Sequence, residues 1–150
     1  MSSEAVAEKA IKYFQSGFNC AQSVLIALYE DIEPGTKNEL VPKIAAGFGG
    51  GIGRCGSVCG ALSGSIMAVG IKDAPNEPGM EKRIKAYADA RTLYNQFKQQ
   101  NGTVFCRELI KLDLSNPEDA AKAKTDGTFR LVCDQLIRSV VKNYLALKSK

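Results

Sequence analysis

The sequence predicts an all-α protein, a single-domain helical bundle of six to eight helices spanning residues 1–150. Three observations support this. Apolar residues recur at helical spacing through most of the chain. Typical capping residues precede several of these stretches, and no segment alternates apolar and polar residues as a half-buried strand would. A length of 150 residues is also usual for one domain.

The first two helices have the clearest signals. Residues 3–15 carry an apolar stripe with acidic residues in the first turn, and Gly17 is a natural stop signal. A second helix is expected after Asn19, because Asn19 and Gln22 fit a capping box. The Pro34-Gly35 pair then ends that helix.

A glycine-rich loop is expected before a central, buried helix. Residues 37–46 predict two short helical pieces, because Pro42 fits only near a helix start. Residues 47–56 hold six glycines, which indicates a loop with positive φ angles or close backbone contacts. Ser57 is the expected cap of the next helix, which runs to about Val69 and is rich in small residues.

Four capping signals divide the rest of the chain. Residues 80–100 predict a long amphipathic helix that Gly102 ends. Thr103 is the expected cap of a short helix, Ser115 opens a further capping box, and Thr128 opens the last helix.

The composition excludes several classes of chemistry. The chain has no histidine, which excludes Ser-His-Asp and Cys-His catalytic units, histidine metal ligands and Cys-x-x-Cys-His haem attachment. No haem is therefore expected. With 45% hydrophobic and 24% charged residues, the chain is too apolar to be disordered.

Location and partners follow from the same composition. The N-terminus has acidic residues and no apolar signal region, and five cysteines are too few and odd in number for a disulfide scaffold. We expect a cytoplasmic protein. The net charge of +4 comes from scattered lysines, so nucleic acid is not an expected partner. Residues 55–71 are uncharged, but their glycines and serines favour a buried helix over insertion into a membrane.

The run from Gly51 to Gly56 matches Gly-x-Gly-x-x-Gly, a pattern of dinucleotide-binding turns. That function requires a strand before the glycines, and the preceding residues look helical or irregular. The pattern is therefore interpreted as a tight loop, and no nucleotide cofactor is expected.

The cysteines carry the strongest functional signal. Cys20, Cys59 and Cys106 fall at expected helix starts, where unpaired N–H groups and the helix dipole stabilise a thiolate. Cys133 lies about one turn into the last helix. Cys55 lies in the glycine-rich loop and is interpreted as a filler. Spacing alone leaves open that all are unrelated buried cysteines.

The residues around these cysteines resemble a known family. The motifs are Asn19-Cys-Ala-Gln-Ser-Val-Leu25, Gly47-Phe-Gly-Gly-Gly-Ile-Gly53 and Cys59-Gly-Ala-Leu-Ser-Gly64, followed by the single cysteines Cys106 and Cys133. Together they resemble the family of small redox-active proteins labelled C_GCAxxG_C_C after its cysteine pattern. The resemblance implies that Cys20, Cys59, Cys106 and Cys133 are the characteristic cysteines, that Cys55 is additional, and that the protein is redox-active.

Three functions remain open. In the first, the four thiolates hold one metal centre for electron transfer, an iron–sulfur cluster ahead of zinc. Backbone groups of Gly51, Gly53 and Gly60 would then approach the sulfurs and tune the centre. In the second, pairs of the same cysteines cycle between dithiol and disulfide. In the third, the cysteines are inert parts of a binding or structural protein.

The sequence leaves the redox partner unidentified. The small residues at Gly60–Gly64 could serve either the core of a monomer or the contact of a homodimer.

Overall fold

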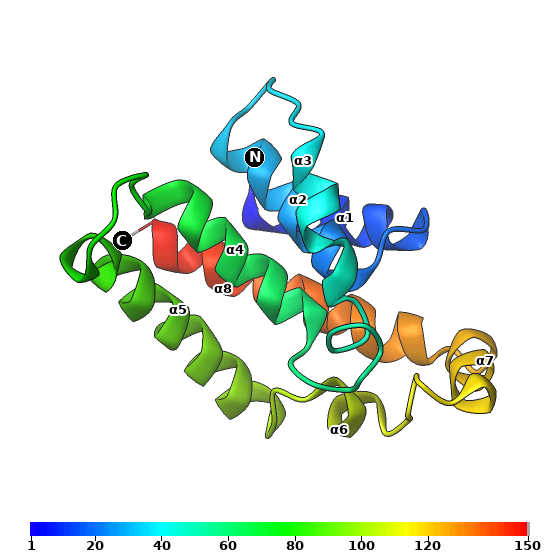
Figure 1. Cartoon of the computed structure of the whole chain (residues 1–150). Helices are drawn as coiled ribbons and strands as arrows, with labels where there is room; N and C mark the ends of the chain where they lie inside the picture. Colours follow the sequence, from blue (N-terminus) through cyan, green and yellow to red (C-terminus); the bar gives the residue numbers. More distant parts are fainter. Residues whose placement is uncertain (150) are drawn as a thin grey trace.

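The computed structural model describes residues 1–149 and confirms the all-α prediction (Figure 1). The described chain forms eight α-helices and contains no strand beyond one isolated bridge between Val58 and Phe105. The elements are α1 (Ser3–Gln15), α2 (Cys20–Ile32), α3 (Leu40–Ala45), the 3-10 turn η1 (Ala46–Phe48), α4 (Gly60–Asp73), α5 (Met80–Asn101), α6 (Cys106–Ile110), α7 (Pro117–Thr125), the π-helical turn η2 (Phe129–Cys133) and α8 (Asp134–Lys148).

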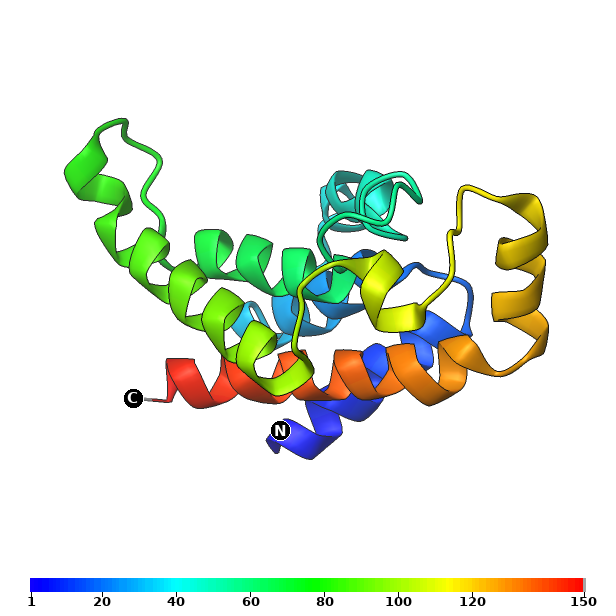
Figure 2. The same cartoon turned by 90° about the horizontal axis from the view of Figure 1, so that it is seen from below.

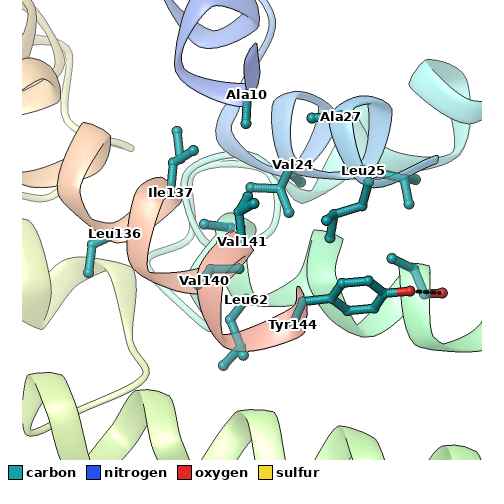
Figure 3. Packing of buried hydrophobic residues seen from close by; sticks show 14 of the residues in the cluster. Ala10, Val24, Leu25, Ala27, Leu62, Leu136, Ile137, Val140, Val141 and Tyr144 are labelled. Atoms are coloured by element: carbon teal, nitrogen blue, oxygen red, sulfur yellow. Dashed lines mark hydrogen bonds between the residues drawn. The ribbon is translucent and has the colours of Figure 1, made fainter. Parts of the chain in front are cut away.

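Helix α2 lies at the centre of the bundle, because α1, α3, α4 and α8 all pack against it. Most of its residues from Ala21 to Leu28 are buried, which explains the near-continuous apolar sequence of this helix. Figure 3 shows side chains of α1, α2, α4 and α8 meeting in the main core. Tyr144 of α8 lies there too, and its hydroxyl donates to the carbonyl oxygen of Ala68 at 3.4 Å.

Helix α5 lies along α4 and α8, whereas α6, α7 and η2 gather at the other end of the molecule (Figure 2). A second, smaller apolar cluster holds this end together. Its buried residues are Cys106, Ile110, Leu114 and Ala123. Val132 packs against both clusters and so joins the small one to the main core.

Small residues let α2 and α4 approach closely. A Cβ atom added at Gly64 would lie 2.7 Å from the carbonyl oxygen of Ala21 and 3.2 Å from Cβ of Val24. A side chain at position 64 would therefore overlap atoms of α2, because protein interiors are close-packed and leave no spare room. The small residues at the start of α4 therefore serve the core of the monomer.

No helix among residues 1–149 is long and apolar enough to cross a membrane.

Two expected helix starts were wrong by a few residues because long-range contacts delay the helix. The helix predicted from Ser57 begins at Gly60, since the Ser57 carbonyl accepts a hydrogen bond from the Cys106 amide at 2.7 Å. The helix predicted from Thr103 begins at Cys106, since the Val58–Phe105 bridge keeps the preceding residues extended.

Two further helix starts differ from the prediction, one in its capping residue and one in the type of its first turn. Asn116, not Ser115, caps α7, because the Asn116 side chain accepts from the amides of Glu118 and Asp119 and Pro117 occupies the first helical position. The last helix does open at Thr128, but its first turn is the π-helical η2 rather than regular α-helix.

The contact between α2 and α4 predicts opposite effects for two glycines of one helix. Gly64→Ala should lower the free energy of unfolding by about 1–3 kcal/mol, because the new methyl group meets backbone atoms of α2. Gly70→Ala is the matched control, because a Cβ there meets nothing within 4 Å. It should leave stability unchanged or raise it by up to about 1 kcal/mol. Urea denaturation measures both, and equal effects would contradict this account of the contact.

Candidate functional site

Four of the five cysteines line one small cavity. Cys20, Cys59, Cys106 and Cys133 come from four separate segments and face a volume of about 20 Å³. The remaining lining residues are apolar or glycine: Gly60, Ala61, Leu109, Ile110 and Leu136. All five cysteines are free thiols, and Cys55 is exposed and lies outside this cavity. The structure therefore brings together the four cysteines of the predicted pattern and separates the fifth.

Cys20 is placed by the predicted capping box at the start of α2. The Asn19 side chain accepts from the Gln22 amide at 2.9 Å, and the Gln22 side chain accepts from the Asn19 amide at 3.0 Å. Asn19 also donates through Nδ2 to the carbonyl oxygen of Ala46 at 2.9 Å, which ties the glycine-rich loop to this helix start. Cys20 is therefore the first residue of a helix whose cap is satisfied and anchored.

Cys59 and Cys106 are placed side by side by the Val58–Phe105 bridge. The Cys59 amide donates to the Val104 carbonyl at 2.8 Å, and the Cys106 amide donates to the Ser57 carbonyl at 2.7 Å. These two antiparallel hydrogen bonds fix the starts of α4 and α6 relative to each other. Nothing in the sequence signals this bridge, since it joins only one residue from each side.

Cys133 reaches the cavity from the last residue of η2. A π-helical turn is wider than an α-helical one and often occurs at functional sites. Here it directly precedes the apolar face of α8, so that Cys133 is half-buried while Ile137, one turn later, lies in the core.

The glycines singled out in the sequence occupy different places. A Cβ at Gly60 would lie 2.4 Å from Sγ of Cys20, so this position needs a residue without a side chain. Gly53 lines a larger neighbouring pocket. Gly51 is buried against the backbone of Ser57 and does not line the cavity. Gly50, which sequence reasoning did not single out, has a backbone amide that opposes the rise in the Cys20 pKa.

The loop from Gly50 to Arg54 winds in the left-handed sense. All five residues have positive φ, including Ile52 and Arg54, both at +64°. This conformation is unfavourable for residues with a Cβ. Backbone hydrogen bonds from Gly53 to the Gly47 carbonyl and from Ser57 to the Gly51 carbonyl, both at 2.9 Å, hold it in place. The loop thus presents a fixed backbone to Cys20 at some local cost.

Burial raises the pKa of all four cavity thiols. For Cys20 the burial effect is opposed by backbone amides, among them those of Gly50 and Gly60. For Cys59 and Cys106, the neighbouring Cys20 raises the pKa further. The pKa of Cys106 rises to about 11. For Cys133 burial comes first, followed by the other three thiols and Asp134. In the absence of a cation the four groups are therefore neutral thiols near neutral pH.

Three of these cysteines also open onto a larger pocket. Cys20, Cys106 and Cys133 form part of the wall of a cavity of about 830 Å³ that lies between the glycine-rich loop, the α1–α2 turn, α7 and η2. Cys59 does not line this pocket. The small cavity thus forms the inner part of the site, and the larger pocket provides the route to it.

The donor set suits an iron–sulfur cluster, because it consists of four thiols that line one small apolar cavity. The inner cavity alone has room for about one water molecule. The additional volume that a cluster needs is available where Cys20, Cys106 and Cys133 face the larger pocket. As they stand, no three Cys, Asp or Glu side chains among residues 1–149 could hold a single metal ion.

The raised pKa values predict that alkaline pH destabilises the metal-free, reduced protein. An unfolded cysteine loses its proton near pH 8.5, whereas the pKa of folded Cys106 is raised to about 11. Between these values the unfolded chain binds fewer protons, so the free energy of unfolding falls as pH rises, by at most about 1.4 kcal/mol per pH unit for each thiol. Urea denaturation at several pH values, with reductant and chelator present, measures this slope.

The control for this prediction uses the chain's own fifth cysteine. Cys106→Ala should make the alkaline slope shallower than Cys55→Ala does, because Cys106 is buried whereas Cys55 is exposed. An identical slope in the protein with all five cysteines and in Cys106→Ala would contradict a raised pKa of Cys106 in the folded protein.

Comparisons with known proteins agree with this arrangement. The family model described as "Putative redox-active protein (C_GCAxxG_C_C)" matches residues 18–146, which include all four cavity cysteines. A protein of Archaeoglobus fulgidus, named only as an uncharacterized protein, is 33% identical over 128 residues, covering 79% of this chain and 83% of the relative. No solved structure matches the chain significantly. From its motifs, its four convergent cysteines and the extent of the match, this chain belongs to the C_GCAxxG_C_C family of redox-active proteins.

Proposed function

We propose that this protein carries electrons on an iron–sulfur cluster held by Cys20, Cys59, Cys106 and Cys133. The observation that carries the proposal is the convergence of these four thiols, from four distant segments, on one small apolar cavity that the fifth cysteine does not reach. Such a cluster accepts and donates single electrons, which zinc cannot do. The family description as redox-active therefore favours a cluster over zinc.

The electrostatics of the cavity support a cationic occupant. Burial raises the pKa of each thiol, and repulsion by neighbouring thiols adds to this effect for Cys59, Cys106 and Cys133, so four thiolates without a cation would be costly there. Binding of iron would replace the protons and remove that cost, since cysteine ligates metals as the thiolate. Metal binding should accordingly release protons and stabilise the fold.

The surrounding backbone is suited to tuning the cluster. The amides of Cys20, Ala21, Gly50 and Gly60 are directed at the Cys20 sulfur. Hydrogen bonds to a ligating sulfur and exclusion of solvent are two of the factors that set a cluster's reduction potential. Leu109, Ile110 and Leu136 supply the apolar side of the cavity.

A second candidate is thiol–disulfide chemistry centred on Cys20 and Cys59. Cys20 has the largest charge effect on Cys59 of all the neighbouring thiols, and Gly60, the residue after Cys59, abuts the Cys20 sulfur. Oxidation would join the two sulfurs and pass two electrons and two protons to an external disulfide. The raised pKa values leave few thiolates near neutral pH to react, so the cluster is the better-supported function.

We also propose that the protein acts in the reducing cytoplasm and exchanges electrons with a separate redox partner. Five free thiols in one chain suit a reducing compartment.

The cluster proposal predicts iron and acid-labile sulfide in protein purified without oxygen. Alanine substitution of Cys20, Cys59, Cys106 or Cys133 in turn should abolish or strongly reduce the iron and sulfide content and the visible charge-transfer absorption. Cys55→Ala is the matched control and should keep both, because Cys55 lies outside the cavity. Iron and sulfide analysis with absorption spectroscopy measures the effect.

Two outcomes would reject the cluster. Colourless, metal-free protein after anaerobic purification and attempted reconstitution with iron and sulfide would contradict it, as would equal iron content in Cys59→Ala and Cys55→Ala. If the same metal-free protein instead showed a reversible loss of two thiols on mild oxidation, absent in Cys20→Ala, the disulfide function would replace it.

A further inference from the structure

The pocket of about 830 Å³ beside the cysteines has the properties of a small-molecule site. Its volume lies within the range of about 300–1,000 Å³ that is usual for ligand pockets. The wall is mostly apolar, with three aromatic rings from separate elements: Phe14 of α1, Phe18 of the α1–α2 turn and Phe129 of η2. Phe14 and Phe129 pack edge to face, with 6.2 Å between their centroids, which makes this part of the wall rigid.

The charged residues of the pocket are unbalanced. Arg54 of the glycine-rich loop, Lys124 of α7 and Arg130 of η2 all line it. Among the described residues, none of these three cations forms an ion pair, although other basic side chains, such as Arg107 and Arg138, do. Cations that converge on a pocket from three elements without carboxylate partners create a positive potential there.

The one acidic residue of the pocket does not neutralise these cations. Asp134 accepts a hydrogen bond through Oδ2 from Nε2 of Gln15 at 3.3 Å. Its Oδ1 is buried and has no hydrogen-bond partner. A buried carboxylate oxygen without a partner is costly, so a donor group on an occupant would be favoured beside it.

The start of α2 adds to the positive potential. Asn19 and Cys20 line the pocket, and the N-terminal end of a helix of this length attracts negative charge. The basic side chains and Phe18 are exposed, whereas Phe14 and Phe129 are partly buried. The pocket thus has a cationic mouth above an apolar interior that ends at three thiols.

From this arrangement we propose that the pocket binds a small organic anion. Its carboxylate or phosphate would contact Arg54, Lys124 and Arg130, and its apolar body would lie among the phenylalanine rings next to Cys20, Cys106 and Cys133. The proposal does not depend on the cluster, because the pocket and its charges are present in the metal-free protein.

The test compares two probes with the same apolar body. The anionic 1-anilinonaphthalene-8-sulfonate should bind the folded, metal-free protein with one site per chain. The neutral N-phenyl-1-naphthylamine, which lacks the sulfonate, should bind at least about tenfold more weakly, because it loses charge-assisted hydrogen bonds to the cations. Titration followed by fluorescence measures both affinities near physiological salt. Equal affinities, or binding of several probe molecules per chain, would overturn the proposal.

Two substitutions on one helix distinguish binding in the pocket from attraction by the protein's overall positive charge. Lys124→Gln removes a pocket cation, whereas Lys122→Gln removes an equal charge from the same helix outside the pocket. Lys124→Gln and Arg130→Gln should each raise the dissociation constant of the anionic probe about three- to tenfold, and Lys122→Gln should leave it unchanged at a screening length of about 8 Å. Both lysines are exposed, so folding is not at risk. Equal effects of the two lysine variants would overturn the proposal.

Alkylation of the thiols locates the bound probe. Saturating anionic probe should slow the labelling of Cys20, Cys106 and Cys133 by iodoacetamide, as mapped by mass spectrometry, and leave the labelling of Cys55 unchanged. Binding without protection of these three cysteines would place the probe elsewhere and reject this pocket as its site. These readouts need no iron, so a failed cluster and a failed anion site give different results.

Discussion

The close contact between the starts of α2 and α4 is the constraint on which the rest of the structure depends. Gly60 abuts the Cys20 sulfur, and Gly64 abuts the Ala21 carbonyl, so the two helices approach nearer than side chains would allow. This contact brings Cys20 and Cys59 to the same cavity, and it places the loop between η1 and α4 over the N-terminal end of α2. A single additional methyl group in this contact would move a sulfur as well as a helix.

The same contact explains why the site combines apolar walls with many backbone amides. Helix starts bring free N–H groups, and glycines let those groups reach a sulfur without intervening side chains. The cavity can therefore lower the cost of negative charge at Cys20 without using a single charged residue. Charged residues are instead found at the outer pocket, where Arg54, Lys124 and Arg130 face solvent.

Local signals could be predicted from the sequence, and long-range ones could not. The capping box of Asn19 and Gln22 lies within one turn of helix, so its residue types alone indicate it. Ser57 and Thr103 look like equally good caps. The Val58–Phe105 bridge, however, keeps the residues after them extended, so both helices start later than predicted. That bridge joins residues far apart in the sequence through backbone atoms, which carry no residue-type signal.

In the cavity too, some features could be predicted from the sequence and others could not. The cysteine pattern distinguished Cys55 from the other four, and the structure places Cys55 outside the cavity. The glycine pattern was less informative, because Gly50 and Gly51 are identical in type while their backbones face different neighbours. Only the left-handed path of the loop, with Ile52 and Arg54 in a conformation that the sequence does not suggest, decides which amide meets Cys20.

The spread of the four cysteines along the chain has a consequence for biosynthesis. The first lies at Cys20 and the last at Cys133, with the final wall residue at Leu136. A nascent chain cannot complete the cavity until Leu136 has left the ribosome, since each cysteine comes from a different segment. The site therefore forms only after the segments that carry all four cysteines have been synthesised and have folded together. A chain cut short before η2 would leave more exposed the thiols that are buried or half-buried in the folded protein.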